Sequence, residues 1–180
     1  MSSAPMQTLQ ALVAARITHV IGIPDNTSGP LFDALAHHPS IRLVRVAREG
    51  EAFAVASGLW LGGASPLVVI QNTGLLESGD ALRGTALRMG APVPMLVTGR
   101  GYAKMEAAGL TPDVERSRAL LTRPDVDSTA LMTEPTLQAW GVPFERCSAG
   151  DDPAAALTRC IDRARNDRMP VATIVARSLT

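Results

Sequence analysis

Cysteine, histidine, lysine and aromatic residues are all scarce in this 180-residue chain, which also lacks excess charge and long apolar runs. The two cysteines, Cys147 and Cys160, form neither a CxxC pair nor a disulfide framework, which fits a reducing cytoplasm. The 17 basic and 17 acidic residues cancel, so nothing indicates a nucleic-acid or membrane-surface binder. No run approaches ~18 consecutive apolar residues, and residues 1–20 lack the pattern of a signal peptide. We therefore expect a cytoplasmic protein with no membrane span.

Several catalytic signatures are missing as well. No GxGxxG follows the first predicted strand, and the chain has no GxxxxGK[ST] phosphate loop and no GxSxG nucleophile elbow. The three histidines, His19, His37 and His38, lack metal-ligand spacing. These absences disfavour a dinucleotide-binding protein, a P-loop enzyme and a serine hydrolase, and we assign no metal ligand to the chain.

Short β-branched runs alternate with helical patterns along the chain. The runs predict strands over residues 19–24, 41–47, 66–72, 93–99, 143–147 and 171–177. The helical patterns cover residues 5–16, 29–38, 49–62, 76–89, 133–140 and 152–167. This alternation predicts one α/β domain over residues 1–180, a doubly wound, mostly parallel six-stranded sheet with helices on both faces. Residues 100–130 break the rhythm and are expected to form a long loop or insertion, in which DVERSRALL could be a short helix.

Glycines and polar residues cluster where the first four predicted strands end. The segments after these strands read GIPDNTSG, REGE, QNTGL and GRGYAK. In open parallel sheets, ligands bind outside the carboxyl ends of the strands. The sequence therefore predicts a site at this edge of the sheet.

Two acids, Glu49 and Glu51, begin a predicted helix that is otherwise almost entirely apolar. Residues two apart on a helix differ by about 200° in direction, so the two carboxylates face different ways. Both acids could simply favour the positive end of the helix dipole. A carboxylate at the mouth of an apolar pocket could instead exchange a proton with a bound heterocycle.

Four segments together resemble the pyrimidine-binding (PYR) domain of thiamine-diphosphate enzymes. They read GIPDNTSGPLFDAL, AREGEAFAVASGLWLGG, PLVVIQNTGL and VPMLVTGRG, and the later TEPTLQAWGVPFE resembles the closing segment of that family. The resemblance covers residues 7–177 and is greatest to phosphonopyruvate decarboxylases and the alpha subunit of sulfopyruvate decarboxylase. It implies thiamine diphosphate as the cofactor and a small 2-oxo acid as the substrate.

The resemblance also implies residue roles. Glu49, followed nine residues later by Gly58, matches the glutamate that hydrogen-bonds N1′ of the aminopyrimidine and favours its imino tautomer; Glu51 does not match. Further cofactor contacts are implied at Pro24, Asn72, Thr73 and Gly74, and substrate contacts at Asp25, Asn26, Thr27 and Arg100. Structural alternatives stay open: QNTGL as an ordinary strand-to-helix turn, Asn26 or Ser28 as a helix cap, and Arg100 as a surface residue.

The pattern by which this family holds magnesium and diphosphate is absent, because the chain contains no GDG. The resemblance thus implies a heteromer in which a separate beta subunit with the pyrophosphate (PP) domain holds Mg²⁺. Two departures bear on the substrate: Glu77 stands where its carboxylate would repel an anionic tail, and residues 100–130 are longer than is usual in the family. The alternatives are a carboligase subunit, a noncatalytic PYR-fold partner for assembly or regulation, and an unrelated doubly wound small-molecule binder.

Overall fold

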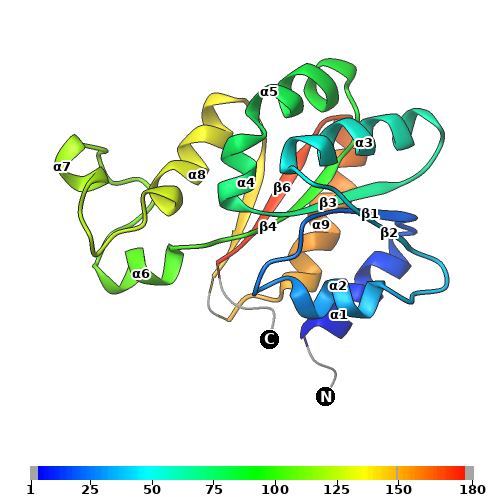
Figure 1. Ribbon diagram of the computed structural model, residues 1–180, viewed down its shortest axis with the longest axis horizontal. Coiled ribbons are helices and arrows are strands. Elements are labelled where there is room, and N and C mark those ends of the chain that lie inside the picture. Colours follow the sequence, from blue (N-terminus) through cyan, green and yellow to red (C-terminus); the bar gives the residue numbers. More distant parts are fainter. Residues whose placement is uncertain (1–3, 149, 177–180) are drawn as a thin grey trace.

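The computed structural model describes residues 4–148 and 150–176, and its centre is one six-stranded sheet (Figure 1). The strands are β1 (His19–Gly22), β2 (Arg42–Arg45), β3 (Pro66–Gln71), β4 (Pro94–Thr98), β5 (Phe144–Cys147) and β6 (Val171–Val175). Their order is β2-β1-β3-β4-β6-β5, and every neighbouring pair is parallel. The predicted doubly wound α/β fold is confirmed. The predicted sixth strand ran to residue 177, which lies outside the described residues.

Helices cover both faces of the sheet, as Figure 1 shows. One face carries α1 (Ala4–Ala14), α2 (Gly29–Leu35) and α9 (Pro153–Asp167). The other carries α3 (Glu49–Leu61), α4 (Asn72–Glu77), α5 (Gly79–Leu82), the π-helical turn η1 (Arg83–Leu87) and α8 (Ser128–Ala139). The central strands β3 and β4 are buried along nearly their whole length, because both of their faces are covered. No helix in the described part of the chain is both long and apolar enough to cross a lipid bilayer.

Three predicted segments differ from the structure. The helix expected over residues 76–89 begins at Asn72 and is divided into α4, α5 and η1, because the chain bends at Ser78. The helix expected from residue 133 begins earlier, at Ser128, where the side chain of Asp127 accepts a hydrogen bond from the Thr129 amide.

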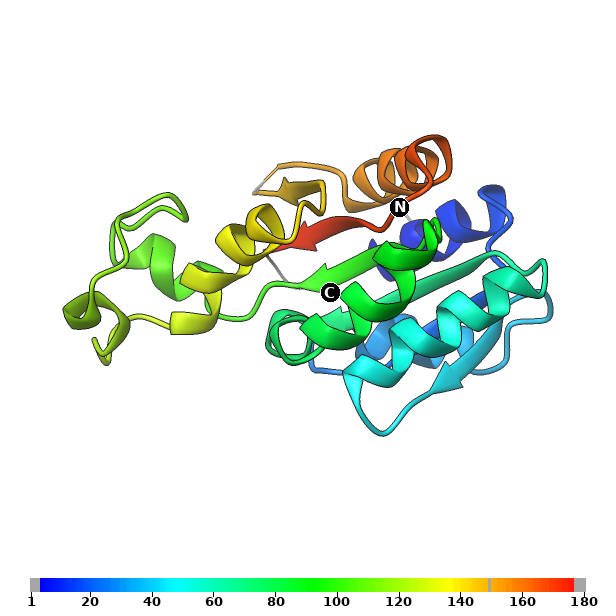
Figure 2. The ribbon, with the colours of Figure 1, turned by 90° about the horizontal axis from the view of Figure 1, so that it is seen from above.

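The segment 100–130 is not a structureless loop. It contains α6 (Tyr102–Ala107) and α7 (Arg118–Leu121), the latter within the segment DVERSRALL. In both views α6 and α7 extend past the carboxyl edge of the sheet, beyond the end of β4 (Figures 1 and 2). Tyr102 and Met105 of α6 are buried in the larger core cluster, so α6 is anchored to the domain. Helices α6 and α7, here called the arm, lie beside the loops in which we predicted the site.

Candidate active site at the carboxyl edge of the sheet

Glu49 is the first residue of α3, which follows β2 after a short turn from Arg45. Its side chain lies over the first turn of α4: a Cβ added to Gly74 would stand 2.2 Å from Glu49 Cγ and 2.5 Å from Oε1. Real Cβ atoms are not found so close to other heavy atoms, so only glycine at residue 74 leaves room for this carboxylate. Glu49 is half-buried, and among the described residues its carboxylate has no hydrogen-bond or ion-pair partner. It is therefore available to a ligand.

Glu51 has a structural role in this geometry. Its Oε2 accepts hydrogen bonds from the backbone amides of Ala47 (3.0 Å) and Arg48 (3.4 Å). These contacts cap the amino end of α3, where the amides lack partners within the helix. A role in stabilising the start of α3 therefore explains why an acid stands at residue 51. The two acids of the opening turn make different contacts: Glu51 caps α3, whereas the Glu49 side chain lies over Gly74.

Glu77 does not present a free negative charge to the site. It forms an ion pair with Arg48, and the Gly50 amide donates to its second oxygen at 3.3 Å. The hydrogen bond from Arg48 lowers the pKa of Glu77 below its usual value. The repulsion that we expected Glu77 to exert on an anionic substrate is therefore offset by a guanidinium, which corrects that expectation.

Asp25 ties together the ends of three strands. Its Oδ1 accepts hydrogen bonds from the Thr27 amide (2.7 Å) and from both the amide (2.7 Å) and hydroxyl (3.0 Å) of Ser28. Its Oδ2 accepts from the Thr98 hydroxyl at the end of β4 and from Gln71 Nε2 (3.4 Å) at the end of β3. Gln71 Oε1 in turn accepts from the Thr73 hydroxyl at 2.8 Å. The loop after β1 is thus fixed to its neighbours by one carboxylate.

Asn72 makes a second tie on the other side of β3. Its side chain is fully buried, donating to the Arg100 carbonyl (2.9 Å) and the Thr133 hydroxyl (3.1 Å) and accepting from the Arg100 amide (3.1 Å). These bonds hold the loop after β4 against α4 and α8. Asn72 therefore positions the loop after β4. Its predicted contact with a cofactor stays a prediction.

The remaining predicted residues lie at the same edge but differ in access. Pro24 and Asn26 are exposed at the tip of the loop after β1, and Thr27 is half-exposed. Ser28 occupies the N-cap position of α2 without a side-chain capping bond. The side chain of Arg100 is 60% exposed and pairs with Asp127 at 3.2 Å, so it is held beside the arm. The structure brings all the predicted site residues to one edge of the sheet.

The carboxyl group of Glu49 fits the aminopyrimidine of thiamine diphosphate. The carboxyl group of Glu49 has no partner among the described residues and stands half-buried above a glycine, where it can share a proton with a ring nitrogen of a heterocycle. No group of three or more potential metal ligands gathers within residues 4–148 and 150–176. The described residues thus offer a place for the pyrimidine but show no cluster for a metal ion.

Sequence reasoning did not name Thr98, Thr133 or Gln71 as site residues, although Gln71 begins the segment QNTGL that it placed at this edge. Thr98 and Thr133 are almost completely buried. Gln71 and Thr98 are the last residues of β3 and β4. A polar residue that ends an otherwise apolar buried strand was the available signal for these two. Thr133 gave no such signal, because it lies inside a helix.

Comparison with known proteins places the chain among proteins of one family. The family described as "Thiamine pyrophosphate enzyme, N-terminal TPP binding domain" matches residues 6–118. Phosphonopyruvate decarboxylase of Streptomyces viridochromogenes is 34% identical over 90 residues, which are 50% of this chain and 23% of that protein. Sulfopyruvate decarboxylase subunit alpha of Methanothermobacter thermautotrophicus is 30% identical over 87 residues, 48% of this chain and 53% of that protein. The match thus spans about a quarter of the first relative and about half of the second.

Solved structures show the same fold. Benzoylformate decarboxylase from Polynucleobacter necessarius superposes with a TM-score of 0.68 at 20% identity, covering 97% of this chain and 30% of that one. The thiamine diphosphate-dependent 4-hydroxybenzoylformate decarboxylase of Rhodococcus jostii RHA1 gives a TM-score of 0.63 at 18% identity, with the same coverage. At these identities the likeness establishes the architecture alone.

Proposed function

The chain belongs to the thiamine pyrophosphate enzymes, matching their N-terminal TPP binding domain, and from this we propose that it is the alpha, pyrimidine-binding subunit of a heteromeric decarboxylase. The single observation that carries the proposal is the Glu49 carboxylate, which has no partner among the described residues and lies over Gly74 at the carboxyl edge of the sheet.

Glu49 is the residue to which we assign the chemistry. Bound thiamine diphosphate supplies the carbon nucleophile and the electron sink that a 2-oxo acid needs to lose carbon dioxide. Glu49 would hydrogen-bond N1′ of the aminopyrimidine and exchange a proton with that atom, which is general acid–base help. Gly74 leaves the room for that carboxylate, and Glu51 fixes the helix end on which it stands.

A separate beta subunit with the PP domain is proposed to complete the site and to hold Mg²⁺ and the diphosphate. The similarity to a protein named as subunit alpha of sulfopyruvate decarboxylase supports this division. A site divided between two chains requires a docking face, so we expect a homo-oligomer or a heteromer rather than a monomer.

The proposed substrate is a small 2-oxo acid such as sulfopyruvate or phosphonopyruvate. Arg100 is the candidate for an anionic tail, because a guanidinium suits a sulfonate or phosphonate. Its pairing with Asp127 leaves most of the side chain exposed, so an anion approaching from solvent can still reach it. A carboligase subunit uses the same first steps and is the nearest alternative. The free Glu49 carboxylate argues against a noncatalytic PYR-fold partner.

Calorimetric titration with thiamine diphosphate and magnesium tests the division of the site. The chain alone is expected to bind the cofactor weakly and to release no carbon dioxide from 2-oxo acids. Co-expression with a GDG-bearing chain is expected to give a heteromer by light scattering, together with tight binding and activity. Tight, magnesium-dependent binding by the chain alone would overturn the half-site proposal.

A further inference from the structure

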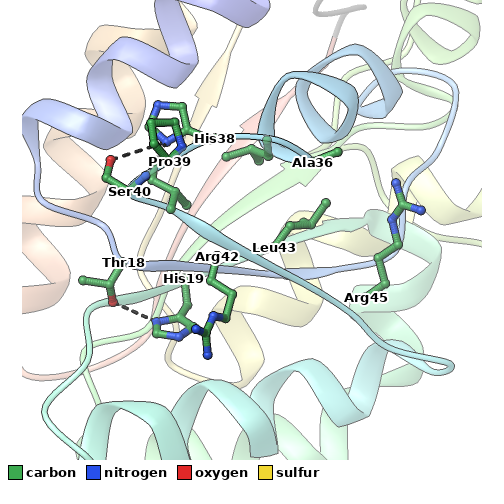
Figure 3. Close-up of a pocket in the computed structure, with 11 residues that line it drawn as sticks. Thr18, His19, Ala36, His38, Pro39, Ser40, Arg42, Leu43 and Arg45 are labelled. Atoms are coloured by element: carbon green, nitrogen blue, oxygen red, sulfur yellow. Dashed lines mark hydrogen bonds between the residues drawn. The ribbon is translucent and has the colours of Figure 1, made fainter.

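A cavity of about 860 Å³ opens at the edge strand β2, away from the candidate active site (Figure 3). It is bordered by the end of α2, the turn that follows it, the first residue of β1, and β2 along its length from Arg42 to Arg45. The lining residues are Thr18, His19, Leu35, Ala36, His38, Pro39, Ser40, Ile41, Arg42, Leu43 and Arg45. Most of them precede the strands or begin them, whereas Glu49 and Gly74 follow strand ends. The cavity therefore belongs to a different part of the molecule.

All the ionisable side chains in this lining are those of basic residues, histidine or arginine. His19, His38, Arg42 and Arg45 face or border the cavity, and the described residues that line it include no carboxylate. Neither arginine forms an ion pair with any described residue, and both are exposed. In a chain with equal numbers of acidic and basic residues, these two arginines make the lining a local concentration of positive charge.

His19 and Arg42 lie side by side at one end of the cavity, and the register of the sheet pairs them directly (Figure 3). Thr18 Oγ1 donates to the Ser65 carbonyl (3.2 Å) and contacts His19 Nδ1 at 2.9 Å, which orients the ring. Burial, and then the charge of Arg42, lower the pKa of His19. The ring is therefore neutral near neutral pH and serves as a hydrogen-bonding partner beside the guanidinium.

Arg45 lies at the opposite end of the same cavity. Residues three apart on a strand point to opposite faces and are separated by about 10 Å along it. Among the described residues β2 pairs with β1 alone, so its outer edge is open there and a ligand can reach both faces around it. Arg42 with His19 is thus positioned for one anionic group, and Arg45 for a second group on a longer ligand.

We propose that this cavity is a binding site for a small molecule that carries phosphate or another doubly charged oxyanion, separate from the candidate active site. Arg42 holds the anion by charge-assisted hydrogen bonds, which a planar guanidinium makes in pairs. His19 and Ser40 offer further polar contacts at the same border. Arginines on an edge strand also discourage pairing with another strand, but that role needs neither the cavity nor the neighbouring histidine.

The test follows the His19 ring resonances by NMR while the full chain is titrated with inorganic phosphate and, separately, with inorganic pyrophosphate. Pyrophosphate is expected to shift these resonances saturably. In Arg42→Gln the affinity should fall roughly tenfold or more, the range for a hydrogen bond to a charged group. Arg88→Gln, which removes an exposed arginine outside the cavity, should bind as the unaltered chain does.

Three results would overturn the proposal. One is the absence of any shift with either anion above roughly 10 mM, which corresponds to negligible affinity. Another is binding that Arg100→Gln abolishes and Arg42→Gln leaves intact, which would place the anion at the candidate active site. The third is a response to a poly-glutamate peptide but not to pyrophosphate, which would make β2 a strand-pairing surface. Because the assay needs neither cofactor nor partner, its outcome is independent of the proposed decarboxylase function.

Discussion

Replacing Gly74 by alanine is the sharpest perturbation of the candidate site, because the substitution adds one methyl group against Glu49. The new Cβ would lie 2.2 Å from Glu49 Cγ and 2.4 Å from Cδ. Carbon atoms in contact are normally about 3.5–4.0 Å apart, so the Glu49 side chain has to move by more than about 1 Å. The position of the carboxylate, and not its chemistry, is what changes.

The expected effect divides between activity and stability. A misplacement of about 1 Å in a catalytic group can cost about 10²-fold in rate, and we expect a loss of that order. Alanine is favoured over glycine in a helix by about 1 kcal/mol, whereas an off-rotamer side chain costs about 0.5–1.5 kcal/mol. These terms nearly cancel, and 1 kcal/mol changes the melting temperature of a chain of this size by only about 2–4 °C.

The assay is carbon dioxide release by the assembled enzyme, measured beside the melting temperature of the chain. Gly84→Ala is the matched control, since no described atom lies within 4 Å of a Cβ added there. It should leave the activity unchanged. Full activity in Gly74→Ala would refute the placement of Glu49, and an activity loss matched by a large fall in melting temperature would indicate misfolding instead.

Two further substitutions test the surroundings of the site. Glu51→Ala removes the side chain that caps α3 at the Ala47 and Arg48 amides, so stability should fall by about 0.5–2 kcal/mol; an unchanged melting temperature would contradict the capping role. Burial raises the pKa of Glu134 above its ordinary value of 4.5. As pH rises, this carboxyl group loses its proton at a lower pH in the unfolded chain than in the folded chain. It therefore makes the free energy of unfolding fall as pH rises from 4.5 through the raised pKa. Glu134→Gln should remove that part of the fall, measured as urea midpoints across this range; identical pH profiles would show that Glu134 does not contribute.

The centre of the sheet was predictable because β3, β4 and β6 are buried along nearly their whole length. Runs such as PLVVI are apolar throughout, and their alternation with helical patterns predicts a parallel arrangement. The division of the helix over residues 72–87 was not predictable, because the bend depends on tertiary contacts: a Cβ at Gly79 would stand 2.6 Å from the ring of Trp140. Helix α6 was not predicted, because it is short and depends on packing of Tyr102 and Met105, whereas α7 lies within the segment DVERSRALL that could be a short helix.

The candidate site was predictable in position but not in detail. The resemblance and the strand-end rule brought Glu49, Asp25 and Asn72 to one edge, and helix geometry separated Glu49 from Glu51. Sequence alone could not show that Asp25 and Asn72 are engaged by their neighbours, because their partners Thr98 and Thr133 are 73 and 61 residues away. Nor could it show that Arg48 offsets the charge of Glu77.

The most direct test of the central claim is Glu49→Gln in the assembled enzyme. The amide keeps the shape of the side chain but cannot hold and return a proton at N1′, so carbon dioxide release should fall by roughly two to four orders of magnitude. The matched control is Glu51→Gln, whose side-chain oxygen can still cap α3 and whose loss should be far smaller. An active Glu49→Gln enzyme, or equal losses in the two variants, would contradict the assignment of Glu49 as the residue that acts on the cofactor.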